Sequence, residues 1–184
     1  TDPDKVKQLH QTLQAVSPLY KNILKGILQE INLLPPGAGM AGIYCMVDQS
    51  QGVFKAPANV SMASVISPAL QVSSAEQEDL NAPLDGKSVC AIRTFVGQGV
   101  LVWGARTLDG NSQDWRYINV RRTMIFIEQS IKTAIRAYVF EPNDANTWAT
   151  VKSMTENFLT NFWKEGGLAG AKPQDAFSVQ IGLG

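Results

Sequence analysis

The sequence predicts an α+β fold in which several helices pack against a small mixed sheet that includes a hairpin. Apolar residues recur at helical spacing in long stretches at both ends of the chain. Two strand-like runs flank the turn "VGQG" as the arms of a hairpin would. With 184 residues the chain can form one compact domain, or one domain plus an arm.

Two helices are predicted at the N-terminal end. The first covers "DPDKVKQLHQTLQAV", and the second begins at Pro18 and ends before Pro35-Pro36, because proline cannot continue a helix. We therefore assign residues 1–32 to helices leading into the domain and 33–184 to the domain itself. The start at Thr1, without a methionine, suggests a processed chain or a fragment.

The short apolar run "MAGIYCMVD" is interpreted as a strand buried on both faces. Cys45 lies in this run and Cys90 in a later one, so we expect two buried free thiols and no disulfide. Residues 49–73 are rich in proline, serine and alanine without a period, which predicts an ordered surface loop. Loops of this length often contact a partner.

A short helix, "SAEQEDLNAP", is predicted next, with Ser74 as N-cap and Gln77 completing a capping box. The hairpin runs "SVCAIRTF" and "GVLVWGART" follow it. The longest helix is predicted from Trp115 to Tyr138, with Glu128 placed to pair with Lys132 one turn later.

The C-terminal part predicts one more helix and a strand. The helix covers Thr147 to Glu165 and ends at a pair of glycines. The final segment, "DAFSVQIGLG", alternates apolar and polar residues as a half-buried strand would.

The sequence offers little chemistry for an enzyme. Sixteen basic and sixteen acidic residues cancel, which gives nucleic-acid binding no global support. The only histidine, His10, is expected on a solvated helix face, so a zinc site or a histidine-based triad is disfavoured. "NAPLDGKS" ends like a phosphate-binding loop, but a helix precedes it and a strand follows it. We predict no catalytic residue, no metal and no cofactor.

No run approaches the roughly 18 apolar residues that span a bilayer, and no signal segment opens the sequence. We therefore expect that the protein is made in the cytoplasm and does not insert into a membrane.

Polar residues gather in two loops beside aromatic ones, "WGARTLDGNSQDW" and "VFEPNDANTW". Arg106 can donate to loop carbonyls or to a carboxylate such as Glu141, and Asn143 and Asp144 can cap the following helix. We interpret these loops as architecture that braces the domain. The bracing candidates are Trp103, Gly104, Arg106, Thr107, Arg121, Arg122, Glu128, Glu141, Pro142, Asn143 and Asp144.

Four segments follow one another along the chain: "LPPGAGMAGIYCMVDQSQGVFKAPANV", "GQGVLVWGARTL", "WRYINVRRTMIFIEQSIKTAIRAYVFEPND" and "AFSVQIG". In this order they resemble the motifs of the contractile tail sheath protein family of phages, R-type pyocins and phage-tail-like injection systems. The resemblance runs from about Tyr20 to Gly184. "PPGAG" and "DQSQG" depart from the serine and arginine that many members carry there. The chain resembles the C-terminal, inner domain, ending before the family's last strands and C-terminal arm.

The resemblance implies a structural subunit that stacks as hexameric rings around an inner tube and contracts to drive the tube through a target envelope. The implied partners are other copies of the chain, the tube protein, and baseplate and terminator proteins, in a phage virion or a released particle. Arms of neighbouring subunits would complete a sheet edge, for which the candidates are Phe177, Ser178, Val179, Gln180 and Ile181. The implied tube-contact candidates are Lys152, Glu156, Asn157, Lys164 and Glu165.

Two alternatives stay open. One is an adaptor or cap that binds a tube without contracting. The other is a hydrolase, which the lone histidine and the lack of a nucleophile motif disfavour.

Overall fold

A computed structural model describes residues 2–182 of the chain. The chain divides into two compact units, with the division between Met40 and Ala41. The division falls inside the helix α3 (Gly37–Gln51), beyond the boundary at 32/33 that we predict from sequence.

The first unit contains the two predicted helices, α1 (Pro3–Val16) and α2 (Pro18–Ile31). Ser17 separates them, and its Oγ accepts a hydrogen bond from the backbone N–H of Tyr20 at 3.3 Å. His10 Nδ1 lies 2.8 Å from the Tyr20 hydroxyl, and the two rings meet edge to face. The prediction of a solvated His10 is therefore wrong, since its side chain is partly buried and hydrogen-bonded to the next helix.

The run that we predict as a strand is the helix α3. Ile43 and Val47 are buried one turn apart, whereas Cys45 and Met46 between them are exposed. A short apolar run fits a buried strand and a half-buried helix equally well, because it has too few residues to show whether the apolar positions follow the helical or the strand period.

This difference also corrects the expectation for the cysteines. Both thiols are free, as predicted, but Cys45 is exposed on α3. Cys90 is half-buried, and its burial raises the pKa of its thiol.

The second unit contains an antiparallel sheet of three strands in the order β1-β3-β2. β2 (Ala91–Phe95) and β3 (Gly99–Trp103) form the predicted hairpin. β1 (Val60–Ser61) pairs with β3, so the stretch predicted as a loop contributes an edge strand. Three consecutive residues of β3, Val100 to Val102, are buried, which shows that both faces of the central strand are covered.

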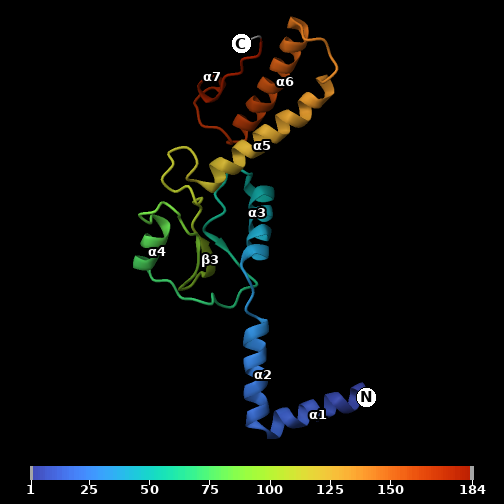
Figure 1. The fold of residues 1–184 in the computed structure, drawn as a ribbon, viewed down its shortest axis with the longest axis vertical. Helices are drawn as coiled ribbons and strands as arrows, with labels where there is room; N and C mark the ends of the chain where they lie inside the picture. Colours follow the sequence, from blue (N-terminus) through green and yellow to red (C-terminus); the bar gives the residue numbers. More distant parts are fainter. Residues whose placement is uncertain (1, 183–184) are drawn as a thin grey trace. The chain divides into compact units, whose positions relative to one another are not determined.

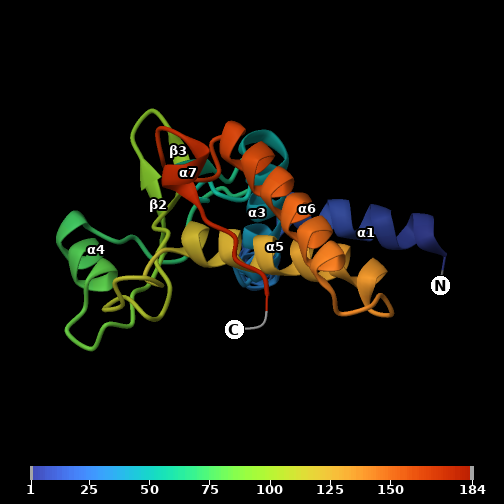
Figure 2. The same cartoon turned by 90° about the horizontal axis from the view of Figure 1, so that it is seen from above.

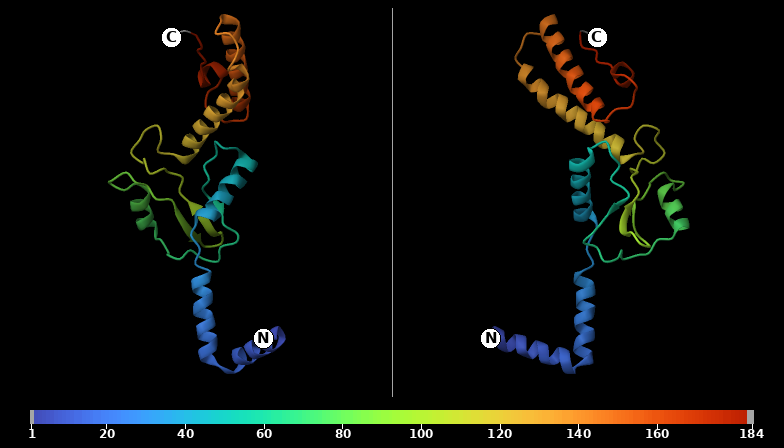
Figure 3. Two further views of the ribbon diagram at one scale, coloured as in Figure 1. Left: turned by 45° about the vertical axis from the view of Figure 1, so that its right-hand side comes forward. Right: turned by 180° about the vertical axis from the view of Figure 1, so that it is seen from behind.

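Helices α3 and α4 (Ser74–Asn81) lie on opposite sides of this sheet (Figures 1 and 3). The capping box of α4 lies one residue earlier than predicted. Ser73 is the N-cap, and the Glu76 carboxylate accepts a hydrogen bond of 2.8 Å from the backbone N–H of Ser73. Gln77 is instead buried and donates to the carbonyl of Trp103 at 3.3 Å. The residue predicted to cap the helix therefore ties it to the end of β3.

The C-terminal half is built on two helices that lie side by side, α5 (Ile118–Ile135) and α6 (Ala145–Lys164), joined through a short 3₁₀ turn (Figures 1 and 2). α6 is longer than α5, contrary to our prediction. α5 begins at Ile118 and not at Trp115, because the preceding residue, Tyr117, is extended and pairs with the loop after β3. Among residues 2–182, Glu128 forms no ion pair with Lys132.

An aromatic cluster holds α5 and α6 together. Ile127, Leu159 and Phe162 are its buried centre. The ring of Phe162 lies 5.6 Å from that of Phe126 and 5.8 Å from that of Phe54, which follows α3 in the chain. The segment after α3 is therefore anchored to the helical pair, and this cluster is the main core of the C-terminal half.

The predicted C-terminal strand is not formed among residues 2–182, and its last two residues lie outside the described range. A single helical turn, α7 (Pro173–Ala176), is followed by an extended stretch that ends the described residues. Phe177 and Val179 are half-buried against the aromatic cluster, whereas Ser178 and Gln180 are exposed. The predicted alternation is present, but within residues 2–182 no neighbouring strand pairs with it, and a strand needs that partner.

Candidate assembly surfaces

The junction between β3 and α5 is closed by backbone hydrogen bonds. Thr107 N–H donates to the carbonyl of Arg116 at 2.9 Å, and its hydroxyl donates to the carbonyl of Trp115 at 2.7 Å. Ile118 N–H, at the start of α5, donates to the carbonyl of Ala105 at 2.9 Å. These bonds fix the first turn of α5 to the end of the hairpin, as expected of a brace.

Arg106 connects three segments at this junction. Its backbone forms a bridge with Tyr117, and its guanidinium carbon lies 5.7 Å from the centre of the Tyr117 ring. Nη1 donates to the carbonyl of Asn81, at the end of α4, at 3.5 Å. Of the two partners considered from sequence, the loop carbonyl is used, and Arg106 forms no ion pair with Glu141 within residues 2–182.

Glycines permit two close approaches of the backbone here. Gly104 has φ of +143°, and a Cβ there would lie 3.0 Å from the Cα of Cys90. Gly110 N–H donates to the carbonyl of Gly86 at 2.8 Å, and a Cβ on Gly110 would lie 2.6 Å from that oxygen. The loops around Gly86 and Gly110 therefore touch main chain to main chain.

The strongest side-chain contact joins α3 to α5. Arg122 donates two hydrogen bonds to the carboxylate of Asp48, Nη1 to Oδ1 at 2.7 Å and Nη2 to Oδ2 at 2.6 Å. The guanidinium carbon also lies 4.8 Å from the centre of the Tyr44 ring. Hydrogen bonding to the Asp48 carboxylate raises the pKa of Arg122, and burial raises the pKa of Tyr44.

Sequence reasoning selects Arg122 but misses its partners. The sequence signal that could identify these partners is the spacing of Tyr44 and Asp48, which is one helical turn. This signal is missed when the run is interpreted as a strand.

Two further contacts support the first turns of α5. Asn119 donates to the carbonyl of Phe54 at 3.0 Å, and the guanidinium of Arg121 lies 4.9 Å from the Trp115 ring centre.

The turn between α5 and α6 is held by its own polar groups. The carboxylate of Asp144 accepts from Thr147 N–H at 2.8 Å and caps α6, as predicted. Asn143 does not cap, because its Oδ1 accepts from the indole N–H of Trp148 at 2.7 Å. Pro142 contributes a carbonyl that accepts from Asp144 N–H at 3.0 Å, and Glu141 N–H donates to the carbonyl of Tyr138 at 3.1 Å.

This cap gives α6 a pH dependence. The hydrogen bond from Thr147 N–H holds the pKa of Asp144 below its ordinary value of 3.8. Because the pKa is lowered in the folded chain, the cap stabilises α6 above pH 3.8, and this contribution is lost as pH falls through the lower, folded-state pKa.

We expect the amide proton shift of Thr147 to titrate in NMR spectra with a midpoint below 3.8. Asp144→Asn should abolish this titration while keeping a capping oxygen. A midpoint at or above 3.8 in the wild-type chain would contradict the assignment.

The tube-contact candidates lie on α6 and just after it. Lys152, Asn157, Lys164 and Glu165 are exposed. Lys152 Nζ lies 3.8 Å from a carboxylate oxygen of Glu156, so these two charges partly compensate each other on the helix surface. A shallow hollow beside them is lined by Ala149, Thr150, Ser153, Met154 and Asn157.

Among residues 2–182, no group of three or more histidine, cysteine, aspartate or glutamate side chains is arranged to hold a metal ion. In the same range, no helix combines the length and the apolar composition needed to cross a membrane.

Comparison with known sequences finds phage tail proteins. Residues 111–181 match the phage tail sheath C-terminal domain family. The tail sheath protein of Vibrio phage KVP40 is 34% identical over 74 residues, which are 40% of this chain and 11% of that protein. The tail sheath protein of Salmonella phage ViI is 24% identical over 139 residues, which are 76% of this chain and 22% of that protein.

Solved structures with the same fold come from contractile particles. A chain of the PVC sheath complex, an extracellular contractile injection system in its contracted state, superposes with a TM-score of 0.77 and 44% identity. The match covers 82% of this chain and 42% of that one. A chain of the six-fold symmetrised anti-feeding prophage baseplate matches with a TM-score of 0.76 and 41% identity, over 81% of this chain and 40% of that one.

The α+β fold and these matches are those of proteins found in phage tails and phage-tail-like contractile particles. More particularly, residues 111–181 match the phage tail sheath C-terminal domain, and the chain is similar to contractile tail sheath proteins. It spans about two fifths of the length of the solved relatives and a smaller share of the phage relatives.

Proposed function

We propose that this chain is the inner domain of a sheath subunit that polymerises as stacked hexameric rings around an inner tube and contracts to drive the tube through a target envelope. The observation that carries the proposal is the 44% identity, over 82% of the chain, to a chain of a sheath complex in its contracted state. The braces at Thr107, Arg106 and Arg122 support it, since a domain that transmits force must resist deformation.

In this proposal a neighbouring subunit supplies the strand that the C-terminal segment lacks. Phe177 and Val179 are anchored in the aromatic cluster, whereas the backbone of residues 178–181 has no strand partner within the described chain. Main-chain hydrogen bonds to an added strand would link subunits along several residues and tolerate changes of side chain. The candidate residues are Phe177, Ser178, Val179, Gln180 and Ile181.

Hydrogen exchange tests this link. The amides of Ser178 to Gln180 should exchange at least about tenfold more slowly in assembled sheath than in the isolated chain, because pairing protects them. The amides of β3 serve as a control, since they are paired in both states. Equal exchange of residues 178–180 in the two states would remove the proposed link.

We also propose that α6 contacts the inner tube through Lys152, Glu156, Asn157, Lys164 and Glu165. Exposed charge pairs are each weak, at about 0–1 kcal/mol, which suits a contact that must hold before firing and release afterwards. Lys152→Glu with Lys164→Glu should then give sheaths that polymerise but no longer retain the tube. Lys5→Glu with Lys7→Glu, which makes the same change of charge on α1, should leave retention unchanged. Normal retention of the tube by the Lys152→Glu, Lys164→Glu variant would exclude this surface of α6 as the tube contact.

The baseplate match supports a second candidate, an adaptor that joins sheath or tube to a baseplate without contracting. In both cases assembly takes place in the bacterial cytoplasm, followed by incorporation into a virion or a released particle. Baseplate and terminator proteins would be partners, and no enzymatic activity is required.

Electron microscopy of the full-length polypeptide, expressed with and without its candidate tube protein, distinguishes a contracting sheath from an adaptor. Striated hollow cylinders with sixfold symmetry are expected of a sheath. Small discrete oligomers under both conditions would favour the adaptor and overturn the sheath proposal.

A further inference from the structure

The chain turns back on itself after α6, and residues 165–182 lie beside that helix (Figures 1 and 3). Gly166, with φ of +90°, allows the turn, and its N–H donates to the carbonyl of Trp163 at 2.9 Å. Gly167 N–H donates to the carbonyl of Phe162 at 2.9 Å. Among the described residues, no backbone N–H beyond Gly167 donates to α5 or α6. The segment after Gly167 therefore needs another attachment to α6.

A single side chain supplies a hydrogen bond to this segment. The indole Nε1–H of Trp163, in the last turn of α6, donates to the carbonyl of Gly170 at 2.9 Å. The indole has this one donor and no acceptor. Within residues 2–182, no other side-chain hydrogen bond joins residues 168–182 to the rest of the chain. Trp163 therefore holds Gly170 against the end of α6.

Gly170 begins a loop that closes on itself. Its φ is +140°, and a Cβ there would lie 2.9 Å from the backbone nitrogen of Ala176, the last residue of α7. Phe177 N–H, one residue later, donates to the carbonyl of Pro173 at 3.1 Å. Because the main chain closes at both points, the loop is expected to move as one piece when Gly170 moves. The place of Phe177 on the core thus depends on where Trp163 holds Gly170.

Apolar packing alone does not determine how the extended stretch after α7 lies along the aromatic cluster. Phe177 and Val179 pack against the cluster, while Ser178 and Gln180 are exposed. A slip of one residue would bury the polar side chains, so the alternation excludes it. A slip of two residues would bring Val179 and Ile181 into the places of Phe177 and Val179, and the alternation would be preserved. Another contact must select between these two registers.

We propose that Trp163 selects the register, through its hydrogen bond to Gly170. The inference rests on the proposed function, in which residues 177–181 pair with a strand of a neighbouring subunit. A strand advances about 3.3 Å per residue, so a slip of two residues would displace the linked subunit by about 7 Å. A helical polymer repeats one spacing, and Trp163 is the positioning residue that keeps this spacing the same in every copy.

Hydrogen exchange of the chain, followed by NMR, measures the effect of Trp163. Trp163→Phe keeps an aromatic ring and removes the donor. The amide of Phe177 should then exchange about fivefold faster, the change expected from the loss of one hydrogen bond, because the loop opens more often. The midpoint of urea unfolding should stay unchanged. Trp148→Phe is the matched control, since it removes an indole N–H that donates to Asn143 at the other end of α6.

Gly170→Ala disturbs the same loop without altering Trp163. The added Cβ would meet the backbone nitrogen of Ala176, which cannot rotate aside, so Phe177 should again exchange faster. Gly97→Ala is its control, because Gly97 also has a positive φ (+77°) but a Cβ there meets nothing within 4 Å. That variant should leave the exchange of Phe177 unchanged.

Sheath assembled from full-length polypeptide tests the consequence for pairing. Protection of the amides of residues 178–180 should be at least about threefold weaker with Trp163→Phe than with the wild type, since some copies would pair out of register. Unchanged exchange of Phe177 in Trp163→Phe, or the same acceleration in Trp148→Phe, would overturn the role of Trp163. Equal protection in the two sheaths would overturn it as well. Absent protection in the wild-type sheath would refute the strand link and this inference together, a failure that is recognised because it needs no variant.

Discussion

Phe162→Ala should lower the free energy of unfolding of the second unit by about 3–5 kcal/mol, the range for a buried phenylalanine truncated to alanine. Phe162 is only 5% exposed, and its ring contacts three other phenylalanines, Phe54, Phe126 and Phe158. These rings come from the segment after α3, from α5 and from α6, so the cavity would open where the three meet. Urea unfolding followed by tryptophan fluorescence measures the loss.

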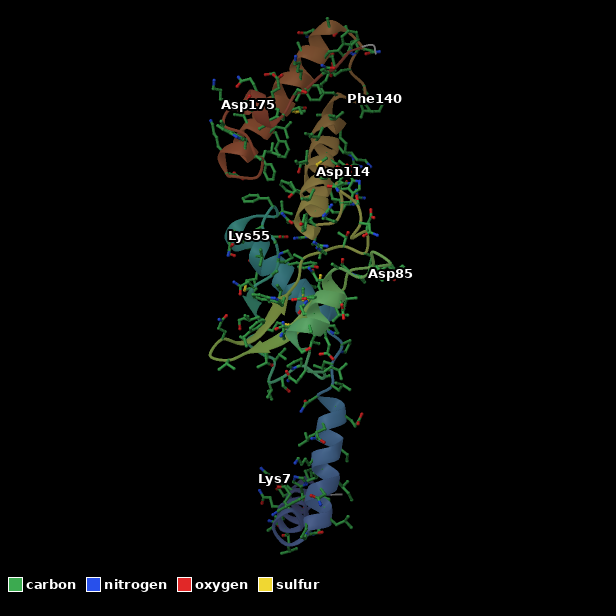
Figure 4. The ribbon with its side chains drawn as sticks, turned by 90° about the vertical axis from the view of Figure 1, so that its left-hand side faces the viewer. Lys7, Lys55, Asp85, Asp114, Phe140 and Asp175 are labelled. Carbon is green, nitrogen blue, oxygen red and sulfur yellow. The ribbon has the colours of Figure 1, made fainter. Side chains whose placement is uncertain are left out.

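Phe140→Ala is the matched control. Phe140 lies in the turn between α5 and α6 and is 99% exposed, with its side chain directed away from the helices (Figure 4). The same change of atoms there should alter stability by less than about 0.5 kcal/mol. A loss below about 1 kcal/mol for Phe162→Ala would show that the aromatic cluster is not the main core.

Asp48→Asn should lower the free energy of unfolding by about 1.5–3 kcal/mol, the range for hydrogen bonds to charged groups. The substitution keeps the shape of the side chain but removes one of the two acceptors facing Arg122 and the negative charge. The two side chains are 25% and 31% exposed, which keeps the expected loss below that of a fully buried pair. Raising the salt concentration should reduce the difference between variant and wild type.

Asp114→Asn, at an exposed carboxylate in the loop before α5, is the control and should be nearly neutral. A double-mutant cycle with Arg122→Met isolates the coupling between Asp48 and Arg122. Coupling near zero would mean that the ion pair does not brace α3 against α5.

The sequence predicts elements well where a pattern is long or a turn is specific. The hairpin around Gly97 and the helix before Gly166 form as expected, because alternation, helical period and turn residues agree there. The run from Met40 to Asp48 is assigned to the wrong element, since nine residues are too few to separate a buried strand from a helix. The capping box of α4 is misplaced by one residue because serines stand at both 73 and 74.

For the bracing residues, too, the sequence predicts only those contacts whose partners are close together in the chain. Asp144 follows from local sequence, since a cap and its helix are neighbours in the chain. The pairing of Asp48 with Arg122 joins positions 74 residues apart, and no local pattern encodes such a contact. The C-terminal segment differs again, because its alternation is visible in the sequence while no strand pairs with it among residues 2–182.

The contact between Gly86 and Gly110 has a consequence for how this sequence can diverge. A side chain at Gly110 would meet a carbonyl oxygen of the main chain, which cannot rotate aside as a flexible side chain could. Neutral drift in this region should therefore alter the residues flanking Gly110 freely, while substitutions and insertions at Gly110 itself are removed. A collection of related sequences should show an island of fixed length and fixed glycine within an otherwise variable loop.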